Sequence, residues 1–214
     1  MNISQKAKGC GNMLFGGAGR KKSAGGLEFL VVGLGNPGMA YEGTRHNAGC
    51  AALAVMAANA GIALTKNQFR ALTGTGTVAG RKTLLLFPQT FMNNSGEAVQ
   101  AAMAFYKLPP DRLVVLSDDI ALPVGAVRVR KKGSDGGQKG LRSIIGCLGT
   151  EEFARVRIGV GAKPHPAYDL ADWVLSKFRP EEQPQMEEAF AHAAAAAEMI
   201  VGGRIDEAMN RYSH

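Results

Sequence analysis

The chain has 214 residues, 46% of them hydrophobic, and a formal net charge of +7. This length suits one domain that buries a core without disulfides. Its cysteines are odd in number and widely spaced, which argues against a disulfide framework or a zinc site and favours a reducing compartment: Cys10, Cys50 and Cys147. No apolar stretch approaches the roughly 20 residues of a membrane-spanning helix. A cytoplasmic protein without membrane association is therefore expected.

The positive charge is unevenly distributed. Residues 1–26 carry five basic and no acidic side chains among seven glycines, and they lack the apolar core of a signal peptide. We expect this segment to be a disordered extension ahead of one domain at 27–214. Residues 126–163 carry nine basic and three acidic side chains, whereas residues 164–214 carry four and nine. The basic middle indicates a surface for phosphates, with an ordinary solvated face as the alternative.

The first expected strand is an apolar run at 27–32, and a glycine-rich loop follows it. The loop places Asn36 among glycines and then leads to His46, at the start of an alanine-rich helix expected over 46–60. Polar side chains thus gather at the carboxyl end of a strand, where open α/β sheets bind ligands.

The rest of the chain alternates expected strands and helices. Strands are expected over 69–79 and 82–87 as a hairpin, and over 112–117, 126–132 and 155–161. Helices are expected from an N-cap at Ser95 to 107, and over 141–148, 180–201 and 205–211. The pattern predicts a single α/β domain with a mixed, mostly parallel twisted sheet and helices on both faces.

The segment Gly33-Leu34-Gly35-Asn36-Pro37-Gly38 also matches the G-x-G-x-x-G pattern of dinucleotide-binding folds. Pro37 removes a backbone N–H from the turn that would hold a pyrophosphate. The acidic residue expected about 20 positions later is missing, because the carboxylate after Glu42 is Glu97. These features argue against a dinucleotide site.

Several motifs, taken together, resemble bacterial-type peptidyl-tRNA hydrolase over about residues 27–212. They occur in the family's order and spacing: GLGNPG at 33–38, Tyr41, TRHNAG at 44–49, TFMNNSG at 90–96, SDD at 117–119, GGQKGL at 136–141 and RVRIGVG at 155–161. The resemblance implies a monomeric α/β enzyme that hydrolyses the ester between a peptide and the 3′ end of tRNA. It implies no metal, no organic cofactor and no obligate protein partner.

The expected catalytic residues are His46 and Asp118, with Asn36 beside them. Ester hydrolysis at neutral pH needs a base to activate water, and a histidine side chain has an unperturbed pKa of about 6.5. Asp118 matches the family's partner of that histidine, and such a carboxylate fixes the tautomer of the imidazole. A histidine that only caps a helix, and an aspartate that only forms a turn, are the alternatives.

The resemblance also implies substrate contacts. Asn36 and Asn93 match positions that hold the peptide and ester region, since an amide both donates and accepts hydrogen bonds. Phe91 and Met92 offer an apolar platform for the terminal adenine, with core packing as the alternative. Tyr41 matches a position that shapes the pocket.

Arg130 and Arg157 fall where the family has cations that hold a tRNA phosphate. The usual His-Asn-Gly of the glycine loop is Gln138-Lys139-Gly140 here, so Lys139 replaces an asparagine and cannot accept a hydrogen bond. Its role as a substrate-binding residue is therefore the doubtful one. The frequent carboxylate before Leu-Pro is also absent, at Ala121.

These observations predict a peptidyl-tRNA hydrolase that recycles tRNA and rescues stalled or dropped-off translation products. One alternative is a non-catalytic RNA-binding relative of the same fold, and a second is a hydrolase of another ester or of a nucleotide. Retention of His46, Asp118, Asn36 and Asn93 favours the enzyme.

Overall fold

A computed structural model describes residues 26–213, so the extension expected at 1–26 lies outside them except for its last residue. The described chain forms one seven-stranded sheet in the order β2-β3-β4-β1-β5-β7-β6. The strands are β1 (Phe29–Gly33), β2 (Lys66–Gln68), β3 (Ala71–Val78), β4 (Arg81–Pro88), β5 (Leu113–Asp119), β6 (Val127–Arg130) and β7 (Ala154–Gly159).

The sheet is mixed, as predicted. Parallel pairs occupy its centre, where β1 lies between β4 and β5 and where β5 pairs with β7. Antiparallel pairs occupy both edges. The parallel share is half of the pairings and smaller than expected, because β2 and β3 at one edge and β6 at the other pair in antiparallel orientation.

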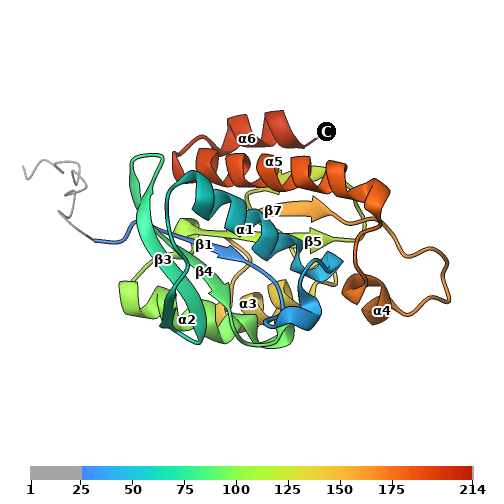
Figure 1. Ribbon diagram of the computed structural model, residues 1–214. Coiled ribbons are helices and arrows are strands. Elements are labelled where there is room, and N and C mark those ends of the chain that lie inside the picture. The colour runs from blue at the N-terminus through green and yellow to red at the C-terminus, as the bar shows by residue number, and fades with distance from the viewer. Residues whose placement is uncertain (1–25, 214) are drawn as a thin grey trace, which may run out of the picture.

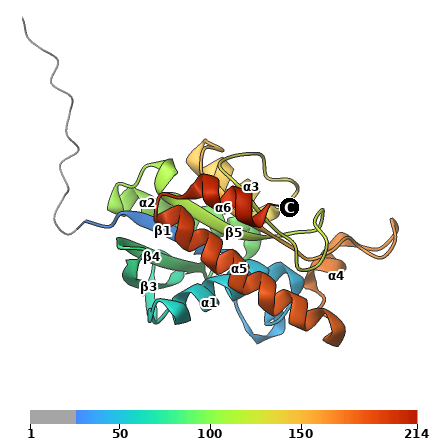
Figure 2. The same cartoon turned by 90° about the horizontal axis from the view of Figure 1, so that it is seen from above.

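Helices cover both faces (Figures 1 and 2). One face packs against α1, α5 and α6 and the other against α2 and α3. The helices are α1 (Ala48–Asn59), α2 (Ser95–Tyr106), α3 (Lys139–Leu148), α4 (Leu170–Leu175), α5 (Gln183–Val201) and α6 (Ile205–Tyr212). Alternation along β1 divides Val31 and Leu30 between the two cores, which is the two-residue period of a strand buried on both faces. No helix within residues 26–213 is long and apolar enough to cross a membrane.

The glycine-rich loop after β1 does not lead directly into a helix. Its backbone continues through two short 3₁₀ turns, Met39–Tyr41 and Arg45–Asn47, and α1 begins only at Ala48. Gly49 explains the position of that helix, since an added Cβ would lie 2.3 Å from the carbonyl oxygen of Leu116. The first turn of α1 therefore lies directly on the carboxyl ends of β1 and β5, and this close approach places His46 beside Asp118.

One local expectation was wrong, and two short elements were missed. The N-cap of α2 is Asn94, and Ser95 is its first residue, whose hydroxyl donates to the carbonyl oxygen of Met92. The short edge strand β2 and the short helix α4 were not predicted. Both are too short to establish a periodic pattern.

Candidate active site

A cavity of about 900 Å³ opens at the carboxyl ends of the central strands. Eight of the ten predicted site residues line it: Asn36, His46, Phe91, Met92, Asn93, Asp118, Lys139 and Arg157. The two others lie outside the lining. Tyr41 contacts the rim through Phe91, and Arg130 lies on the edge strand β6. The topology thus gathers residues that are as much as 121 positions apart (36 to 157).

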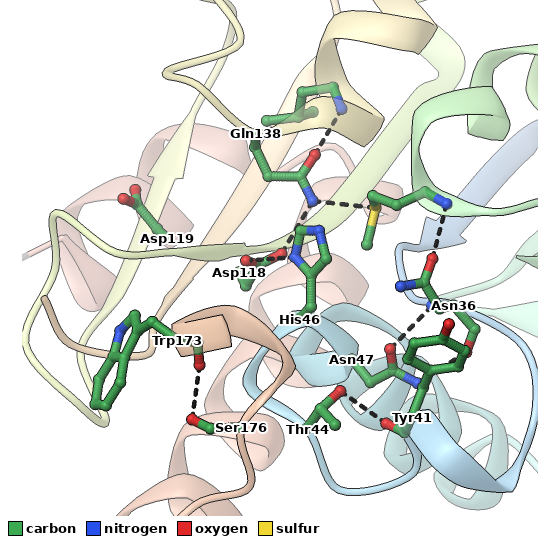
Figure 3. Close-up of polar contacts among 12 residues, drawn as sticks. Asn36, Tyr41, Thr44, His46, Asn47, Asp118, Asp119, Gln138, Trp173 and Ser176 are labelled. Carbon is green, nitrogen blue, oxygen red and sulfur yellow. Dashed lines mark hydrogen bonds and ion pairs between the residues drawn. The ribbon is translucent and has the colours of Figure 1, made fainter. Parts of the chain in front are cut away.

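His46 and Asp118 form a buried pair in the wall of this cavity (Figure 3). Nδ1 of His46 lies 2.8 Å from Oδ2 of Asp118, and both residues are less than 10% exposed. A carboxylate only accepts hydrogen bonds, so Nδ1 donates and the neutral imidazole has its lone pair on Nε2. Nε2 has no protein partner among residues 26–213. The geometry therefore leaves a free base in the cavity.

Gln138 holds the other oxygen of Asp118. Its Nε2 donates to Oδ1 of Asp118 at 2.9 Å, and its Oε1 accepts from the backbone N–H of Leu141 at 2.8 Å (Figure 3). Gln138 is thereby the N-cap of α3 as well as a neighbour of the pair. Both carboxylate oxygens of Asp118 have protein donors.

Asn36 is fixed by a second amide. Asn47 accepts from the backbone N–H of Asn36 at 2.9 Å and donates to its carbonyl oxygen at 3.0 Å. The Asn36 side-chain oxygen accepts from the backbone N–H of Met92 at 2.8 Å. The amide oxygen is therefore already engaged, and the Nδ2 group is the part of Asn36 left free to act as a donor in the cavity.

The rim near Asn36 is apolar and open. Phe91 is 58% exposed and meets Tyr41 edge to face, with ring centroids 6.3 Å apart. Met92 is instead buried in the core below the cavity, so core packing is its structural role. Asn93 is exposed at the cavity, and its Nδ2 donates only to the neighbouring Asn94.

Arginines alternate along the edge strand β6 and its neighbour β7. Arg128 lies opposite Arg157, and Arg130 lies opposite Arg155, on the sheet face that α2 and α3 cover only in part. Arg155 is buried and donates to the carbonyl oxygens of Ser134 and Glu151, and burial lowers its pKa. It therefore fixes the glycine loop, whereas Arg128, Arg130 and Arg157 keep partly exposed side chains.

Two carboxylates form ion pairs with arginines that line the cavity. Asp119 pairs with Arg157. Asp135 pairs with Arg142, whose hydrogen bond, together with that from the Gly137 N–H, holds the pKa of Asp135 below its usual range. Lys139, the first residue of α3, is exposed in the lining and has no side-chain partner among residues 26–213. It is a free cation close to the pair.

The wall opposite α3 is α4, which contributes Leu170 and Val174. Arg45 anchors this wall to the 3₁₀ turn that carries His46. Its guanidinium lies 3.9 Å from the ring centroid of Trp173, donates to the carbonyl oxygen of Val160 and pairs with Glu182 at 2.7 Å. The wall and the turn that carries His46 are thus built as one unit.

The sequence motifs contain four further residues of this site but gave no role to them: Asn47, Asp119, Gln138 and the buried Arg45. Asn47 and Arg45 stand beside His46 in the TRHN motif, and Asp119 stands beside Asp118. The sequence signal for these three residues was their position next to a predicted site residue. The role of Gln138 depends on a contact across 20 positions, which the sequence does not encode as a spacing rule.

Comparisons with known proteins agree with this geometry. The family model described as "Peptidyl-tRNA hydrolase" matches residues 30–214. The chain is 47% identical to "Peptidyl-tRNA hydrolase" of Agathobacter rectalis over 186 residues, covering 86% of this chain and all of the relative. It is 48% identical to the protein of the same name from Alkaliphilus oremlandii over 184 residues, covering 86% of this chain and 98% of the relative.

A solved structure has the same fold. The crystal structure of peptidyl-tRNA hydrolase from Acinetobacter baumannii matches with a TM-score of 0.82 and 35% identity, covering 87% of this chain and 96% of that one. Sequence and structure therefore agree over most of the chain. The chain belongs to the peptidyl-tRNA hydrolase family.

Proposed function

We propose that this protein hydrolyses the ester bond between a peptide and the 3′ end of tRNA. The observation that carries the proposal is the buried His46–Asp118 pair, whose free Nε2 faces a cavity that also contains Arg157. A base for an ester and a cation for a phosphate then share one site. Family membership supports the same reaction.

His46 acts on water in this mechanism. Nε2 removes a proton from a water molecule as its oxygen attacks the ester carbonyl, and Asp118 stabilises the imidazolium that forms. The tetrahedral intermediate collapses by breaking the bond to the 3′ oxygen of the tRNA. That oxygen takes the proton from His46, which returns the base to its starting state. The peptide leaves as a carboxylic acid, which loses its proton to solvent and becomes a carboxylate.

A protein nucleophile is not needed. His46 has no hydrogen bond to a serine, threonine or cysteine among residues 26–213, although Ser117 lies in the lining. Cys50 lies behind the loop at Gly35, and burial raises the pKa of its thiol to about 12. A thiol with that pKa stays protonated at neutral pH and is a poor nucleophile. Direct attack by water is the simplest route.

Asn36 and Asn93 supply the polar contacts for the acyl group. The free Nδ2 group of Asn36 can donate to the ester carbonyl oxygen as negative charge develops there. Asn93 is exposed in the lining and its amide offers both an acceptor and a donor, which suits the next peptide unit. An aminoacyl ester lacks that unit and has an ammonium group, so these amides would remain unpaired and disfavour it.

Arg157 and Arg130 are proposed to hold tRNA phosphates. Arg157 lines the cavity and Arg130 extends the basic face to the sheet edge, with Arg128 opposite Arg157. Phosphate contacts carry no sequence information, which suits an enzyme that acts on many tRNAs. Phe91 and the neighbouring Tyr41 ring offer a stacking surface for the terminal adenine.

Lys139 is assigned to a phosphate near the 3′ end rather than to the acyl group. Its ammonium is a donor without acceptor capacity and has no side-chain carboxylate partner within residues 26–213. A flexible point charge at the cavity mouth suits a phosphate oxygen. The other relevant alternative, a non-catalytic RNA-binding protein, is disfavoured because it has no use for a buried His–Asp pair with a free Nε2.

The proposed setting is a cytoplasmic monomer that acts on peptidyl-tRNA in translation. The test compares peptide release from N-acetyl-aminoacyl-tRNA with amino-acid release from the unacetylated ester. Wild type should cleave only the acetylated substrate, and His46→Ala should lose turnover while still binding tRNA. His192→Ala, on the exposed side of α5, is the matched control. A folded wild type that binds tRNA without cleaving either ester would establish the RNA-binding alternative.

A further inference from the structure

The Gln138 side chain connects three parts of the site that are distant in sequence. Its Nε2 lies 2.9 Å from Oδ1 of Asp118 and 3.3 Å from the sulfur of Met92, and its Oε1 lies 2.8 Å from the N–H of Leu141. The residue is buried and lines the cavity. A surface glutamine would have none of these constraints.

The contact with Leu141 determines which end of the amide faces Asp118. A backbone N–H can only donate, so the atom next to Leu141 must be the oxygen of the amide. The NH₂ group is then left to face the carboxylate. The hydrogen-bond network by itself therefore assigns the orientation of the amide.

The same contact explains why the donor is rigid. Gln138 is the N-cap of α3, and its oxygen satisfies one of the free N–H groups of the first helical turn. Movement of the amide away from Asp118 would leave that N–H unpaired. The helix therefore holds the donor in place.

Asp118 needs such a donor to present the correct oxygen to His46. A carboxylate with a single hydrogen bond can rotate about its Cβ–Cγ bond. With Oδ1 held by Gln138, the plane of the carboxylate is set and Oδ2 stays 2.8 Å from Nδ1 of His46. The imidazole then keeps its proton on Nδ1 and its lone pair on Nε2.

We propose that Gln138 is a positioning residue for catalysis, which fixes the carboxylate of Asp118 and through it the tautomer and orientation of His46. This inference rests on the proposed hydrolase function. It assigns a role to a side chain that does not touch the reacting atoms and to which the sequence motifs gave no role.

The test distinguishes the hydrogen bond that the Gln138 amide donates to Asp118 from the one that it accepts at the start of α3. Gln138→Glu keeps an oxygen to cap α3 and removes the donor to Asp118, whereas Gln138→Met removes both hydrogen bonds. Gln138→His restores one donor and one acceptor in its neutral ring. The matched control is Gln100→Met, because Gln100 also donates an amide hydrogen bond to α3, at the carbonyl oxygen of Cys147 and outside the cavity.

Steady-state hydrolysis of N-acetyl-aminoacyl-tRNA, thermal unfolding and nitrogen-15 NMR of His46 are measured for each variant. We expect kcat to fall up to about 100-fold in Gln138→Glu and Gln138→Met, with KM within about threefold of wild type, because small misplacements of a catalytic group have costs of this size. Gln138→Glu should keep the cap of α3 but lower the melting temperature, because its carboxylate faces the buried carboxylate of Asp118. The His46 tautomer should shift away from Nδ1–H in Gln138→Met, and Gln138→His and Gln100→Met should resemble wild type.

The inference is overturned if Gln138→Glu retains wild-type kcat with an unchanged His46 tautomer. It is also overturned if the decrease of kcat in each variant only follows the decrease of folded protein, since Gln138 would then be a helix cap alone. An inactive wild type would instead contradict the proposed hydrolase function. The NMR comparison would still test the positioning role, because it does not depend on turnover.

Discussion

Asp118 and Asp119 are consecutive residues of β5, and their carboxylates bind different side chains of the same cavity. Asp118 accepts from His46, and Asp119 pairs with Arg157. This arrangement at the carboxyl end of one strand joins the proposed chemistry to the proposed phosphate site. Because each carboxylate binds a different side chain, the two functions should separate in kinetic experiments. Substitutions at the His46–Asp118 pair should change kcat, whereas substitutions at the phosphate site should change KM and its salt dependence.

Asp118→Asn should reduce kcat about 100-fold or more and change KM little. The asparagine amide can donate toward Nδ1 of His46 and so favours the tautomer with its proton on Nε2, where the base is needed. The measurement is steady-state cleavage of N-acetyl-aminoacyl-tRNA. Asp111→Asn, in the exposed turn before the same strand, is the control and should match wild type. A KM effect as large as the kcat effect would contradict this role.

Arg157→Gln and Arg130→Gln should raise KM and make binding less sensitive to salt. Removing one phosphate-binding cation should reduce the slope of log affinity against log salt by about 1, whatever the tRNA sequence. The measurement is tRNA affinity between about 50 and 200 mM salt. Arg81→Gln on β4 serves as the control, because β1, β5 and β7 separate β4 from β6. An unchanged slope in both cavity-side variants would remove the arginines from the phosphate site.

Lys139→Gln should raise KM several-fold at low salt and leave kcat within about threefold of wild type. A contact with a ground-state phosphate stabilises substrate and transition state equally, so its removal affects KM alone. Comparison at low and high salt checks the electrostatic origin. If kcat falls instead, Lys139 acts on the charge that develops at the ester, and its assignment to a phosphate is wrong.

The sequence was sufficient for the fold and for eight of the lining residues because strong local signals coincide with function there. Apolar runs marked the central strands, and glycine and asparagine clusters marked the loops at their carboxyl ends. What the sequence did not reveal depends on tertiary contacts. The N-cap of α3 became a catalytic neighbour only because α3 packs beside β5. Helix α4, which forms one wall of the cavity, is too short to show a hydrophobic period in the sequence. In the sequence alone, Arg45, which anchors α4, is indistinguishable from a surface charge, because its partners are distant along the chain.

Glu182→Gln should destabilise the fold by about 3–5 kcal/mol at neutral pH, because it leaves the buried guanidinium of Arg45 without its carboxylate. Burial opposes ionisation of Glu182, but hydrogen bonds from the Arg179 backbone and the Arg45 side chain outweigh it and hold its pKa below the ordinary 4.5. A depressed folded-state pKa stabilises the protein above that ordinary value. The contribution is lost as pH falls below 4.5 toward the folded-state pKa.

Urea unfolding of wild type and Glu182→Gln at pH 7 and at pH values below 4.5 checks this prediction. The difference in unfolding free energy should be largest at pH 7 and should shrink on acidification, as the wild-type carboxylate becomes protonated. Glu188→Gln, on the exposed face of α5, should show neither the destabilisation at pH 7 nor its pH dependence. A difference that stays constant with pH would mean that Glu182 stabilises the fold through packing and that its charge contributes nothing. Arg45 precedes His46 in the same 3₁₀ turn. Glu182→Gln should therefore also lower kcat under conditions in which the variant is still folded.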